Sequence, residues 1–298
     1  MLLMNQGNQK IIFSILTSGQ RESLIKSLRS IQELKVHEKR ILLVDSGPSS
    51  ALPDKIQEME FDLIHLRVES NSGIATHRAE GLKHLLKLDF DYVLQLDDDV
   101  VLQPDCFHHL LATMEEDPRL GLAAPVILDN QGGVLSAGGI YLRYLGQPFL
   151  LHTSNPVARS LDFATGTMGL IRKSALQETG LFDLRFDPYG FEDIDYCLRM
   201  RDKGWSIRLV PDAKCVHVTS YSFHHETVTR LFQTTAHRLL CAWKFAPGFW
   251  FFAAFLPWYM IRRVAYPMLK FICTGRIDLA ASVAKGVQNG WSKMDHTS

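Results

Sequence analysis

Three consecutive aspartates, Asp97, Asp98 and Asp99, follow the apolar run "YVLQL". Because side chains alternate along a strand, Asp97 and Asp99 are expected to share one face and Asp98 to point to the other. Two carboxylates at contact distance repel each other by about 4 kcal/mol at an effective dielectric constant of about 20. A solvated strand end would relieve this repulsion. A hard divalent cation, bound through oxygen and bridging to a diphosphate, would relieve it as well.

A second acidic cluster, Glu192, Asp193 and Asp195, stands at the expected start of a helix in "GFEDIDYCLRMRDKGW". Acidic residues in a first turn cap free amides and interact favourably with the helix dipole. Capping needs only one carboxylate, and this segment supplies three. One of them is therefore a candidate general base towards a hydroxyl group.

His217 follows a short apolar run in "AKCVHVTSYSFHH". A single histidine is usually a structural residue, but imidazole together with carboxylates suits Mn²⁺ or Mg²⁺. His217 is thus a candidate ligand if the sheet returns it to the aspartates. The sequence has no zinc motif, no G-x-G-x-x-G and no P-loop, which argues against dinucleotide redox chemistry and P-loop phosphoryl transfer.

Strands and helices alternate in the first hundred residues, which predicts βαβ units and an α/β fold with a mixed, mostly parallel sheet flanked by helices. Ligands of such sheets bind outside the carboxyl ends of the strands. Thr17, Asp45 and the three aspartates end three expected strands, so a site is predicted there. The expected strands are residues 10–16, 40–45, 61–68 and 91–97, and the expected helices are residues 21–34 and 73–88. Glycine-punctuated strands between 120 and 220 are expected to complete the sheet.

Residues 245–261 carry no charged side chain, and eight of these 17 residues are Phe, Trp or Tyr. A helix of this length reaches about 25 Å, short of the roughly 30 Å hydrocarbon core of a bilayer. Pro247 and Pro257 are expected to interrupt it further. Aromatic residues favour the boundary between lipid headgroups and acyl chains, so a helix on the membrane surface is predicted. A buried core helix or a homodimer interface is the alternative.

These features predict two regions, residues 1–223 and a C-terminal helical region of residues 224–298 that associates with the membrane. The basic residues after 261 would face anionic lipid. The chain has 32 basic and 32 acidic side chains, so its net charge gives no reason to expect nucleic acid as a partner. Five scattered cysteines and no apparent export signal predict a cytoplasmic protein, peripheral on the cytoplasmic face of the membrane.

Seven segments, taken in order, resemble family-2 glycosyltransferases of the GT-A fold over residues 10–222. They are "ILTSGQRESL", "ILLVDSG", "NSGIATHRAEG", "LQLDDDVVLQPD", "TGTMGLIRKSALQETGLFD", "FEDIDYCLRMRDKGW" and "VPDAKCVHVTSYS". The resemblance implies a hexosyltransferase (EC 2.4) that uses a divalent cation, Mn²⁺ or Mg²⁺. It would move one sugar, with inversion, from a nucleotide-diphosphate donor to a glycan or lipid-linked acceptor in surface polysaccharide synthesis.

The resemblance also implies roles for individual residues. Asp193 would be the catalytic base, with Glu192 as its support and as the alternative base. Asp97, Asp99 and His217 would form the metal site. The nucleotide-sugar donor would be bound by Thr17, Asp45, Asn71, Gly73, Arg78, Asp97 and Asp98.

The sequence departs from the family pattern in places. "ILTSGQ" stands where relatives often have "IPTYNR", and Ala79 replaces the Asn that often follows the arginine. The Q-x-x-R-W signature of processive synthases is absent, which predicts the addition of one sugar at a time and a pattern most similar to rhamnosyltransferase-like enzymes. Two other functions compete: an inactive GT-A-fold membrane scaffold, and a sugar-1-phosphate nucleotidyltransferase, although the Gly-rich first loop of the latter is missing.

Overall fold

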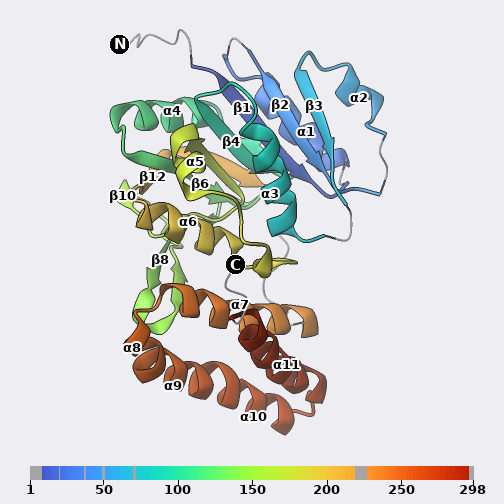
Figure 1. Ribbon diagram of the computed structural model, residues 1–298. Coiled ribbons are helices and arrows are strands. Elements are labelled where there is room, and N and C mark those ends of the chain that lie inside the picture. The colour runs from blue at the N-terminus through green and yellow to red at the C-terminus, as the bar shows by residue number, and fades with distance from the viewer. Residues whose placement is uncertain are drawn as a thin grey trace.

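The structure is a computed structural model that describes residues 9–19, 21–36, 38–48, 51–69, 72–218 and 227–294. A sheet covered by helices forms one part of the molecule, and helices from the C-terminal region form the other (Figure 1). The end of the last helix lies near the junction between the two parts (Figure 1).

The first half of the sheet consists of parallel strands, as predicted. In space the order is β4 (Tyr92–Asp97), β1 (Ile11–Thr17), β2 (Arg40–Asp45) and β3 (Asp62–Arg67). Between these strands the chain forms α1 (Arg21–Gln32), α2 (Asp54–Gln57) and α3 (Ile74–Leu85).

The second half of the sheet makes it mixed. It continues from β4 through β11 (Met168–Arg172), β6 (Leu120–Leu128) and β12 (Ser206–His217) to β10 (Arg159–Ser160). Strand β11 is antiparallel to both β4 and β6, whereas β12 is parallel to β6. Two short strands lie off this path: β5 (Val100–Leu102) pairs with β12, and β7 (Val134–Ser136) pairs with β6. The helices of this half are α4 (Cys106–Glu116), α5 (Lys173–Thr179), the short η2 (Leu184–Phe186) and α6 (Glu192–Asp202).

Both faces of the sheet are covered, because its central strands are apolar on both sides. Alternation along β1 sends Phe13 into one cluster, with Leu28 of α1 and Phe107 of α4, and sends Ile12 into the other. This second cluster is continuous from the sheet, through Phe186, to Leu240 in the C-terminal region. The C-terminal helices therefore share a hydrophobic core with the sheet.

The C-terminal region is helical, as predicted. It begins with α7 (Val228–Phe245), continues through α8 (Gly248–Trp250), η3 (Phe251–Phe255), α9 (Leu256–Tyr259), η4 (Met260–Ala265) and α10 (Tyr266–Cys273), and ends with α11 (Ile277–Met294). Within the described ranges, no helix combines the length and the apolar character needed to cross a bilayer.

The expectation that Pro257 interrupts the helix is wrong. Helical backbone continues from Gly248 to Cys273, and Pro257 lies at the start of α9, directly after the π-helical turn η3. A π-turn shifts the preceding carbonyl groups, which relieves the clash that a proline ring meets in a regular α-helix. Pro247 does mark the start of this helix, as its N-cap.

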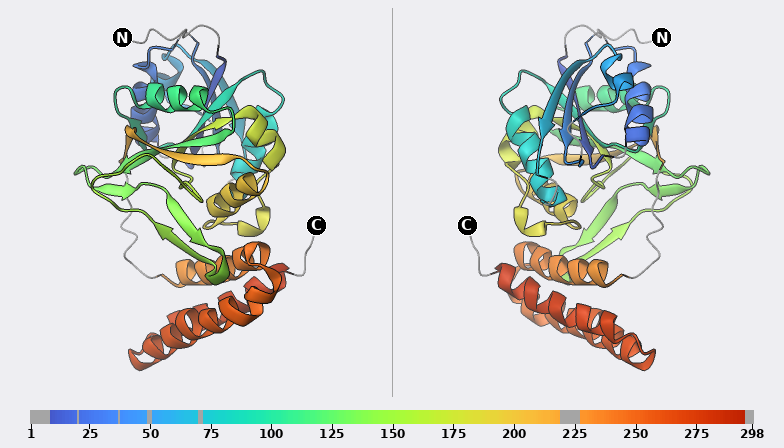
Figure 2. Two further views of the ribbon diagram at one scale, coloured as in Figure 1. Left: turned by 90° about the vertical axis from the view of Figure 1, so that its left-hand side faces the viewer. Right: turned by 90° about the vertical axis from the view of Figure 1, so that its right-hand side faces the viewer.

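A hairpin connects the two parts of the molecule. It consists of β8 (Gly139–Leu142), the short η1 (Arg143–Leu145) and β9 (Gln147–Leu150), and it reaches from the sheet to the C-terminal helices (Figure 2). At its tip, a Cβ atom on Gly146 would come within 2.7 Å of Ala242 and Phe255. The tip also packs Tyr144 edge-on against Trp250, with ring centroids 5.5 Å apart.

The packing of α3 on β2 can be tested at Gly81. A Cβ atom there would come within 2.8 Å of Cγ2 of Val44. On an exposed helix, Gly→Ala stabilises by about 1 kcal/mol. Here we expect Gly81→Ala to lower the free energy of unfolding by about 1–3 kcal/mol, because the added methyl overpacks the core. Urea unfolding followed by circular dichroism measures the change.

The double variant Gly81→Ala/Val44→Ala is the control. Shortening Val44 makes room for the new methyl, so the two substitutions together should cost less than the sum of their separate effects. Additive costs, or stabilisation by Gly81→Ala alone, would contradict the close approach of α3 to β2.

Candidate active site

Strands β1, β2 and β4 bring their carboxyl ends to one edge of the sheet, as predicted. Thr17 is the register partner of Asp45, and its neighbour Leu16 is the partner of Asp97. Thr17 also donates a hydrogen bond from Oγ1 to Oδ2 of Asp98, 2.5 Å away, and both side chains are buried. This bond fixes the start of the acidic segment against β1.

The three aspartates do not all lie on a strand, contrary to the expectation. Strand β4 ends at Asp97, and Asp98 and Asp99 form a turn before β5 begins at Val100. The reason is that β5 leaves β4 to pair with β12 instead. The turn still directs Asp98 towards Thr17 and brings Asp99 back beside Asp97.

The pairing of β12 with β5 places His217 beside the aspartates. His217 is the register partner of Val100, and the next residue, Val218, donates its amide to the carbonyl oxygen of Asp99 at 2.8 Å. Nε2 of His217 lies 3.1 Å from Oδ1 of Asp99. One ligand atom each from Asp97, Asp99 and His217 lie within 4.8 Å of one another. The sheet thus brings His217 back to the aspartates, which was the condition for its role as a candidate metal ligand.

Electrostatics in this cluster favours an added positive charge. The pKa of Asp97 is raised to about 7, because burial disfavours its charged form and Asp99 adds repulsion, while Arg78 acts in the opposite direction. Burial would lower the pKa of His217, but its hydrogen bond to Asp99 and the aspartate charges outweigh burial and raise it. Two carboxylates and one imidazole form a donor set that fits a divalent cation such as Mn²⁺ or Mg²⁺.

The second acidic cluster lies at the start of α6. Oδ2 of Asp193 accepts the amide of Gly166 at 3.0 Å, and its Oδ1 accepts its neighbour's amide, that of Ile194, at 2.8 Å. Oε2 of Glu192 accepts the amide of Gly190 at 2.7 Å. Asp195 has a different role, because it is fully buried and forms ion pairs with Arg199 at 2.8 Å and with Lys244.

Helix capping accounts for only part of this cluster, because Asp193 accepts the first-turn amide of Ile194 and also that of Gly166 outside the helix. The N-cap of α6 is Phe191, whose side chain makes no cap hydrogen bond. Burial, together with the charge of Asp193, raises the pKa of Glu192 to about 7. Burial also raises the pKa of Asp193, against the opposing effect of Arg78. A buried carboxylate with a raised pKa is a stronger base than a solvated one.

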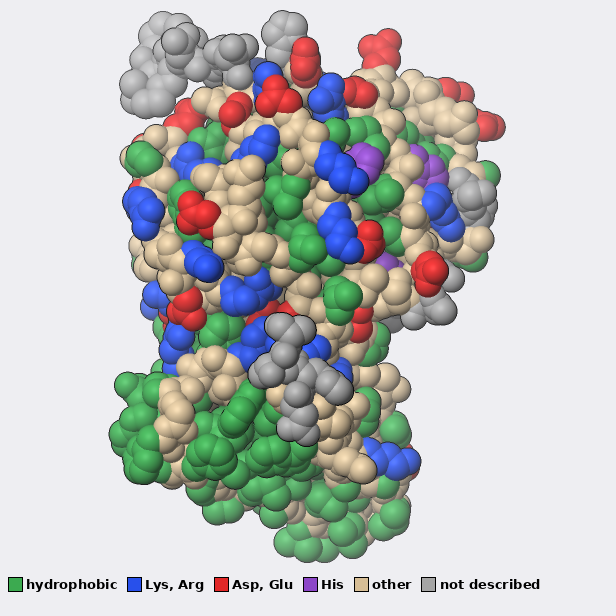
Figure 3. All heavy atoms as spheres, in the orientation of Figure 1, with side chains coloured by type: hydrophobic (Ala, Val, Ile, Leu, Met, Phe, Trp, Pro, Cys, Tyr) green, Lys and Arg blue, Asp and Glu red, His purple; other side chains and the backbone are tan. Residues whose placement is uncertain are grey.

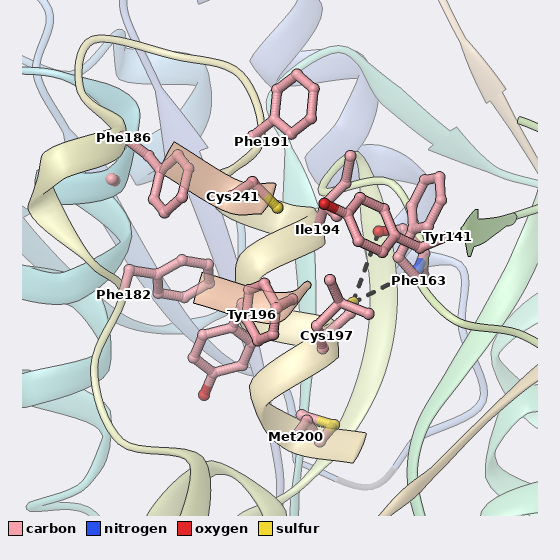
Figure 4. Packing of buried hydrophobic residues seen from close by; sticks show 14 of the residues in the cluster. Tyr141, Phe163, Phe182, Phe186, Phe191, Ile194, Tyr196, Cys197, Met200 and Cys241 are labelled. Carbon is pink, nitrogen blue, oxygen red and sulfur yellow. Dashed lines mark hydrogen bonds between the residues drawn. The ribbon is translucent and has the colours of Figure 1, made fainter. Parts of the chain in front are cut away.

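A short segment, residues 165–167, joins the two acidic clusters. The carbonyl oxygen of Thr167 accepts the amide of Asp97 at 3.0 Å, and the amide of Gly166 binds Asp193. On the N-terminal side of this segment, the amide of Ala164 donates to Sγ of Cys197, 3.5 Å away on α6 (Figure 4). Cys197, on the inward face of α6, therefore binds the chain directly before residues 165–167, which lie between Asp97 and Asp193.

The inward face of α6 is mostly apolar. Ile194, Cys197 and Leu198 are buried. Figure 4 shows Ile194 and Cys197 in the surrounding cluster. Tyr196 stacks on Phe182, with ring centroids 4.1 Å apart.

Arg78 is buried on α3, and its Nη2 lies 3.5 Å from Oδ1 of Asp97. A Cβ atom on Gly166 would come within 2.5 Å of the Arg78 guanidinium, so a side chain at this position would displace the guanidinium. Gly73 is the N-cap of α3, and a Cβ there would come within 2.3 Å of Asp187. Asn71 lies outside the described residues, as do His224 and His225 at the end of "AKCVHVTSYSFHH".

Asp45 is fully buried at the end of β2. Its Oδ2 lies 2.9 Å from Nη1 of Arg67 and 2.9 Å from Nε2 of His65, and its Oδ1 accepts the amide of Gly47 at 2.8 Å. Sequence reasoning did not single out Arg67 or His65. Both lie on β3 near its carboxyl end, where β3 pairs in parallel with β2. Assuming this parallel pairing at the sequence level would have placed both residues near Asp45.

Two solved structures show which fold this arrangement belongs to. The mannosyltransferase PcManGT from Pyrobaculum calidifontis, in complex with GDP-Man and Mn²⁺, matches with a TM-score of 0.59 and 13% identity over 97% of this chain and 89% of that one. GalNAc-T7 with UDP, GalNAc and Mn²⁺ matches with a TM-score of 0.56 and 13% identity over 90% and 59% of the two chains. The fold is that of GT-A glycosyltransferases.

Curated sequences provide further relatives. Poly-beta-1,6-N-acetyl-D-glucosamine synthase of Staphylococcus aureus (strain COL) is 24% identical over 209 residues, which are 69% of this chain and 49% of that protein. The synthase of the same name from Staphylococcus epidermidis is 25% identical over 215 residues, 71% of this chain and 50% of that protein. The chain spans about half the length of these relatives.

The family model described as "Glycosyltransferase like family 2" matches residues 24–235, a range that contains both acidic clusters, His217 and the first part of α7. The chain therefore belongs to glycosyltransferase family 2.

Proposed function

We propose that this enzyme moves one sugar, with inversion at the anomeric carbon, from a nucleotide-diphosphate donor to a hydroxyl group of a glycan or lipid-linked acceptor. The observation that carries the proposal is the arrangement of carboxylates on the two sides of residues 165–167. Asp97, Asp99 and His217 lie on one side, and Asp193 lies on the other. One side suits a leaving diphosphate and the other suits an attacking hydroxyl.

In this proposal Asp97, Asp99 and His217 hold Mn²⁺ or Mg²⁺. Support comes from their mutual distances and from the raised pKa of Asp97, since both indicate that the cluster favours positive charge. The solved structures similar in fold were determined with Mn²⁺ and UDP or GDP-Man. When bound, the cation neutralises the charge that develops on the departing nucleotide diphosphate.

The remaining residues of the donor side surround this site. Thr17 and Asp45 border the nucleobase and ribose, and Asp98 is held there by Thr17. Gly73 and Arg78 line the diphosphate side, and Asn71, for which the same role is proposed, lies outside the described residues. Because Arg78 is buried and contacts Asp97, it contributes positive charge beside the metal site rather than an exposed ligand.

Asp193 is the proposed base, and Glu192 supports it. The Gly166 amide orients the Asp193 carboxylate, and burial raises its pKa. Asp193 takes the proton of the acceptor hydroxyl while the oxygen attacks the anomeric carbon on the face opposite to the leaving group. The new C–O bond forms as the bond to the diphosphate oxygen breaks, so a single displacement inverts the configuration.

The relatives named as polysaccharide synthases support a glycan or lipid-linked acceptor in surface polysaccharide synthesis. The missing Q-x-x-R-W signature supports the addition of one sugar at a time. Similarity to rhamnosyltransferases in particular stays a prediction. The complete set of candidate catalytic residues argues against an inactive scaffold. The absence of a Gly-rich loop after the first strand argues against a nucleotidyltransferase.

We also propose that the region from residue 224 onwards lies on the cytoplasmic face of the membrane. The exposed charged side chains among the described residues of this region are five basic ones, Arg262, Arg263, Lys270, Arg276 and Lys285, and one acidic one, Asp278, although the whole chain is neutral. Hydrophobic side chains gather over this part of the surface (Figure 3). Those exposed on the described helices include Phe249 (75% exposed), Trp250, Phe252, Ile261, Tyr266, Leu269 and Ile272. Apolar and aromatic area beside basic residues fits an anionic headgroup layer, whereas a homodimer interface gives no reason for the excess of positive charge.

Metal and donor binding can be measured together. Calorimetric titration with UDP, dTDP and GDP, each with and without Mn²⁺, should show one nucleotide that binds at micromolar concentration only with the metal. Asp99→Asn should weaken Mn²⁺ binding at least about tenfold, because it removes a ligand. Asp98→Asn removes the same charge one residue away and should weaken Mn²⁺ binding much less, since Asp98 bonds to Thr17. Equal losses in both variants would argue against the assigned ligands.

The assignment of the base predicts that Asp193→Asn lowers kcat by about 10²–10⁴-fold while nucleotide and Mn²⁺ binding persist. Transfer requires unprotonated Asp193, whose pKa burial raises, so kcat/KM should decline as the pH falls, with a midpoint above the ordinary aspartate pKa of 3.8. Glu192→Gln removes a neighbouring negative charge, lowers the pKa of Asp193 and should move this acidic limb to lower pH. Full activity of Asp193→Asn would remove the assignment.

Membrane binding is tested by co-sedimentation with vesicles of neutral phosphatidylcholine or of phosphatidylcholine with phosphatidylglycerol. We expect binding to the anionic vesicles that weakens at high salt. Arg262→Glu/Lys270→Glu should weaken it at least about 30-fold, since each basic residue near the surface contributes about 1 kcal/mol and two are lost. Lys26→Glu/Arg29→Glu reverses two exposed charges on α1 and is the matched control. A concentration-dependent dimer without vesicle binding would support the interface alternative.

A further inference from the structure

The loop that precedes α6 is held by two helices of the C-terminal region. This loop, residues 183–191, ends directly before Glu192 and Asp193. Nζ of Lys293 on α11 lies 2.5 Å from the carbonyl oxygen of Arg185 and 3.3 Å from that of Asp187. The third contact of the same ammonium is Nε2 of His237 on α7, at 2.9 Å. All three hydrogens of Lys293 therefore have an acceptor.

His237, which contacts Lys293, also binds the end of the loop. Its ring is fully buried, and Nδ1 lies 2.9 Å from the carbonyl oxygen of Gly190 and 3.1 Å from that of Tyr189. Because Lys293 donates to Nε2, the imidazole is neutral and carries its hydrogen on Nδ1, where it donates to the loop. Two side chains thus contact four carbonyl groups of the loop.

The other side of the loop contacts the elements that carry the site. Oδ1 of Asp187 accepts the amides of Ala75 and Thr76 at 2.9 and 3.2 Å, which caps α3, the helix of Arg78. At the end of the loop, the amide of Gly190 binds Glu192. The loop is therefore positioned between the C-terminal helices on one side and the two site helices on the other.

The backbone directly before the acidic cluster needs such support. Phe191 has a φ angle of 72°, a conformation that residues other than glycine rarely adopt. Conformations of this kind persist where surrounding contacts determine them. The carbonyl of the preceding residue, Gly190, is the one that His237 binds, and Arg238 lies over the Phe191 ring at 5.2 Å from its centroid.

We propose that Lys293 and His237 are positioning residues for the catalytic base: they fix the loop of residues 183–191 and thereby the carboxylates at the start of α6. The proposal rests on the proposed role of Asp193 as the base. It assigns the C-terminal helices to the support of the active site, in addition to any contact with the membrane. A displacement of about 1 Å at a reacting group costs up to about 10²-fold in rate, so a loosened loop should slow transfer strongly.

The test compares two substitutions on α11 in the full-length protein. Lys293→Met keeps the apolar stem and removes the ammonium, and Lys285→Met makes the same change at an exposed position. Nucleotide binding with Mn²⁺ gives the concentration of folded sites, to which kcat is normalised. We expect Lys293→Met to lower kcat at least tenfold with nucleotide affinity within twofold of the wild type, and Lys285→Met to change neither. Lys293→Arg, which retains donors, should recover part of the rate.

Hydrogen exchange provides a readout that does not need activity. In Lys293→Met, peptides covering residues 183–195 should exchange at least about fivefold faster. Peptides from β4 should be unchanged. A merely structural role of Lys293 would instead speed exchange throughout and lower nucleotide binding together with the rate.

The outcomes separate this proposal from the proposed function. Normal kcat and normal exchange in Lys293→Met, beside an inactive Asp193→Asn, would overturn the positioning role and leave the base in place. Full activity of Asp193→Asn would remove the base assignment, and exchange in Lys293→Met would still decide whether Lys293 holds the loop.

Discussion

Burial of acidic side chains is the constraint on which the rest of the site depends. Asp97, Glu192 and Asp193 all have raised pKa values, and the positive charge of Arg78 opposes the shift in each of them. One guanidinium thus serves carboxylates on both sides of residues 165–167. Its position on α3 has to be accurate, since the glycines at positions 73, 81 and 166 leave no space beside Asp187, Val44 and Arg78. The close packing of α3 is therefore an electrostatic requirement of the site.

The C-terminal helices also contribute positive charge beside buried acidic side chains. Lys244 on α7 forms ion pairs with Asp195 in α6 and with Asp183 at the start of the preceding loop, at 2.5 Å for the latter. Together with Lys293, this places basic side chains of the C-terminal region against the segment that carries the proposed base. The region also shares a hydrophobic core with the sheet. The predicted boundary at residue 223 thus divides the sequence by composition more clearly than it divides the structure by packing.

Local periodicity explains which features could be predicted from the sequence. The strands that end at Thr17, Asp45 and Asp97 have clear apolar patterns, and parallel pairing makes their ends converge. The turn at Asp98 and Asp99 was not predictable, because it depends on β5 pairing with a strand more than a hundred residues later. The same holds for Lys293, whose contact with Arg185 spans 108 residues and has no local pattern. Sequence periodicity thus locates the acidic residues, whereas long-range pairing determines how they are held.

The distribution of charge along the chain is consistent with two anionic ligands that bind at separate places, a nucleotide diphosphate and anionic lipid. The region before residue 227 has an excess of acidic side chains, since residues 227–294 hold nine basic and one acidic of a balanced total. A nucleotide diphosphate brought to Asp97 and Asp99 would meet like charge, so donor binding at this edge of the sheet calls for a cation between them. Anionic lipid beside the C-terminal helices would instead meet basic side chains directly. In the proposed function, the acidic site therefore binds its nucleotide diphosphate through a metal ion, whereas exposed basic side chains of the C-terminal helices contact lipid directly.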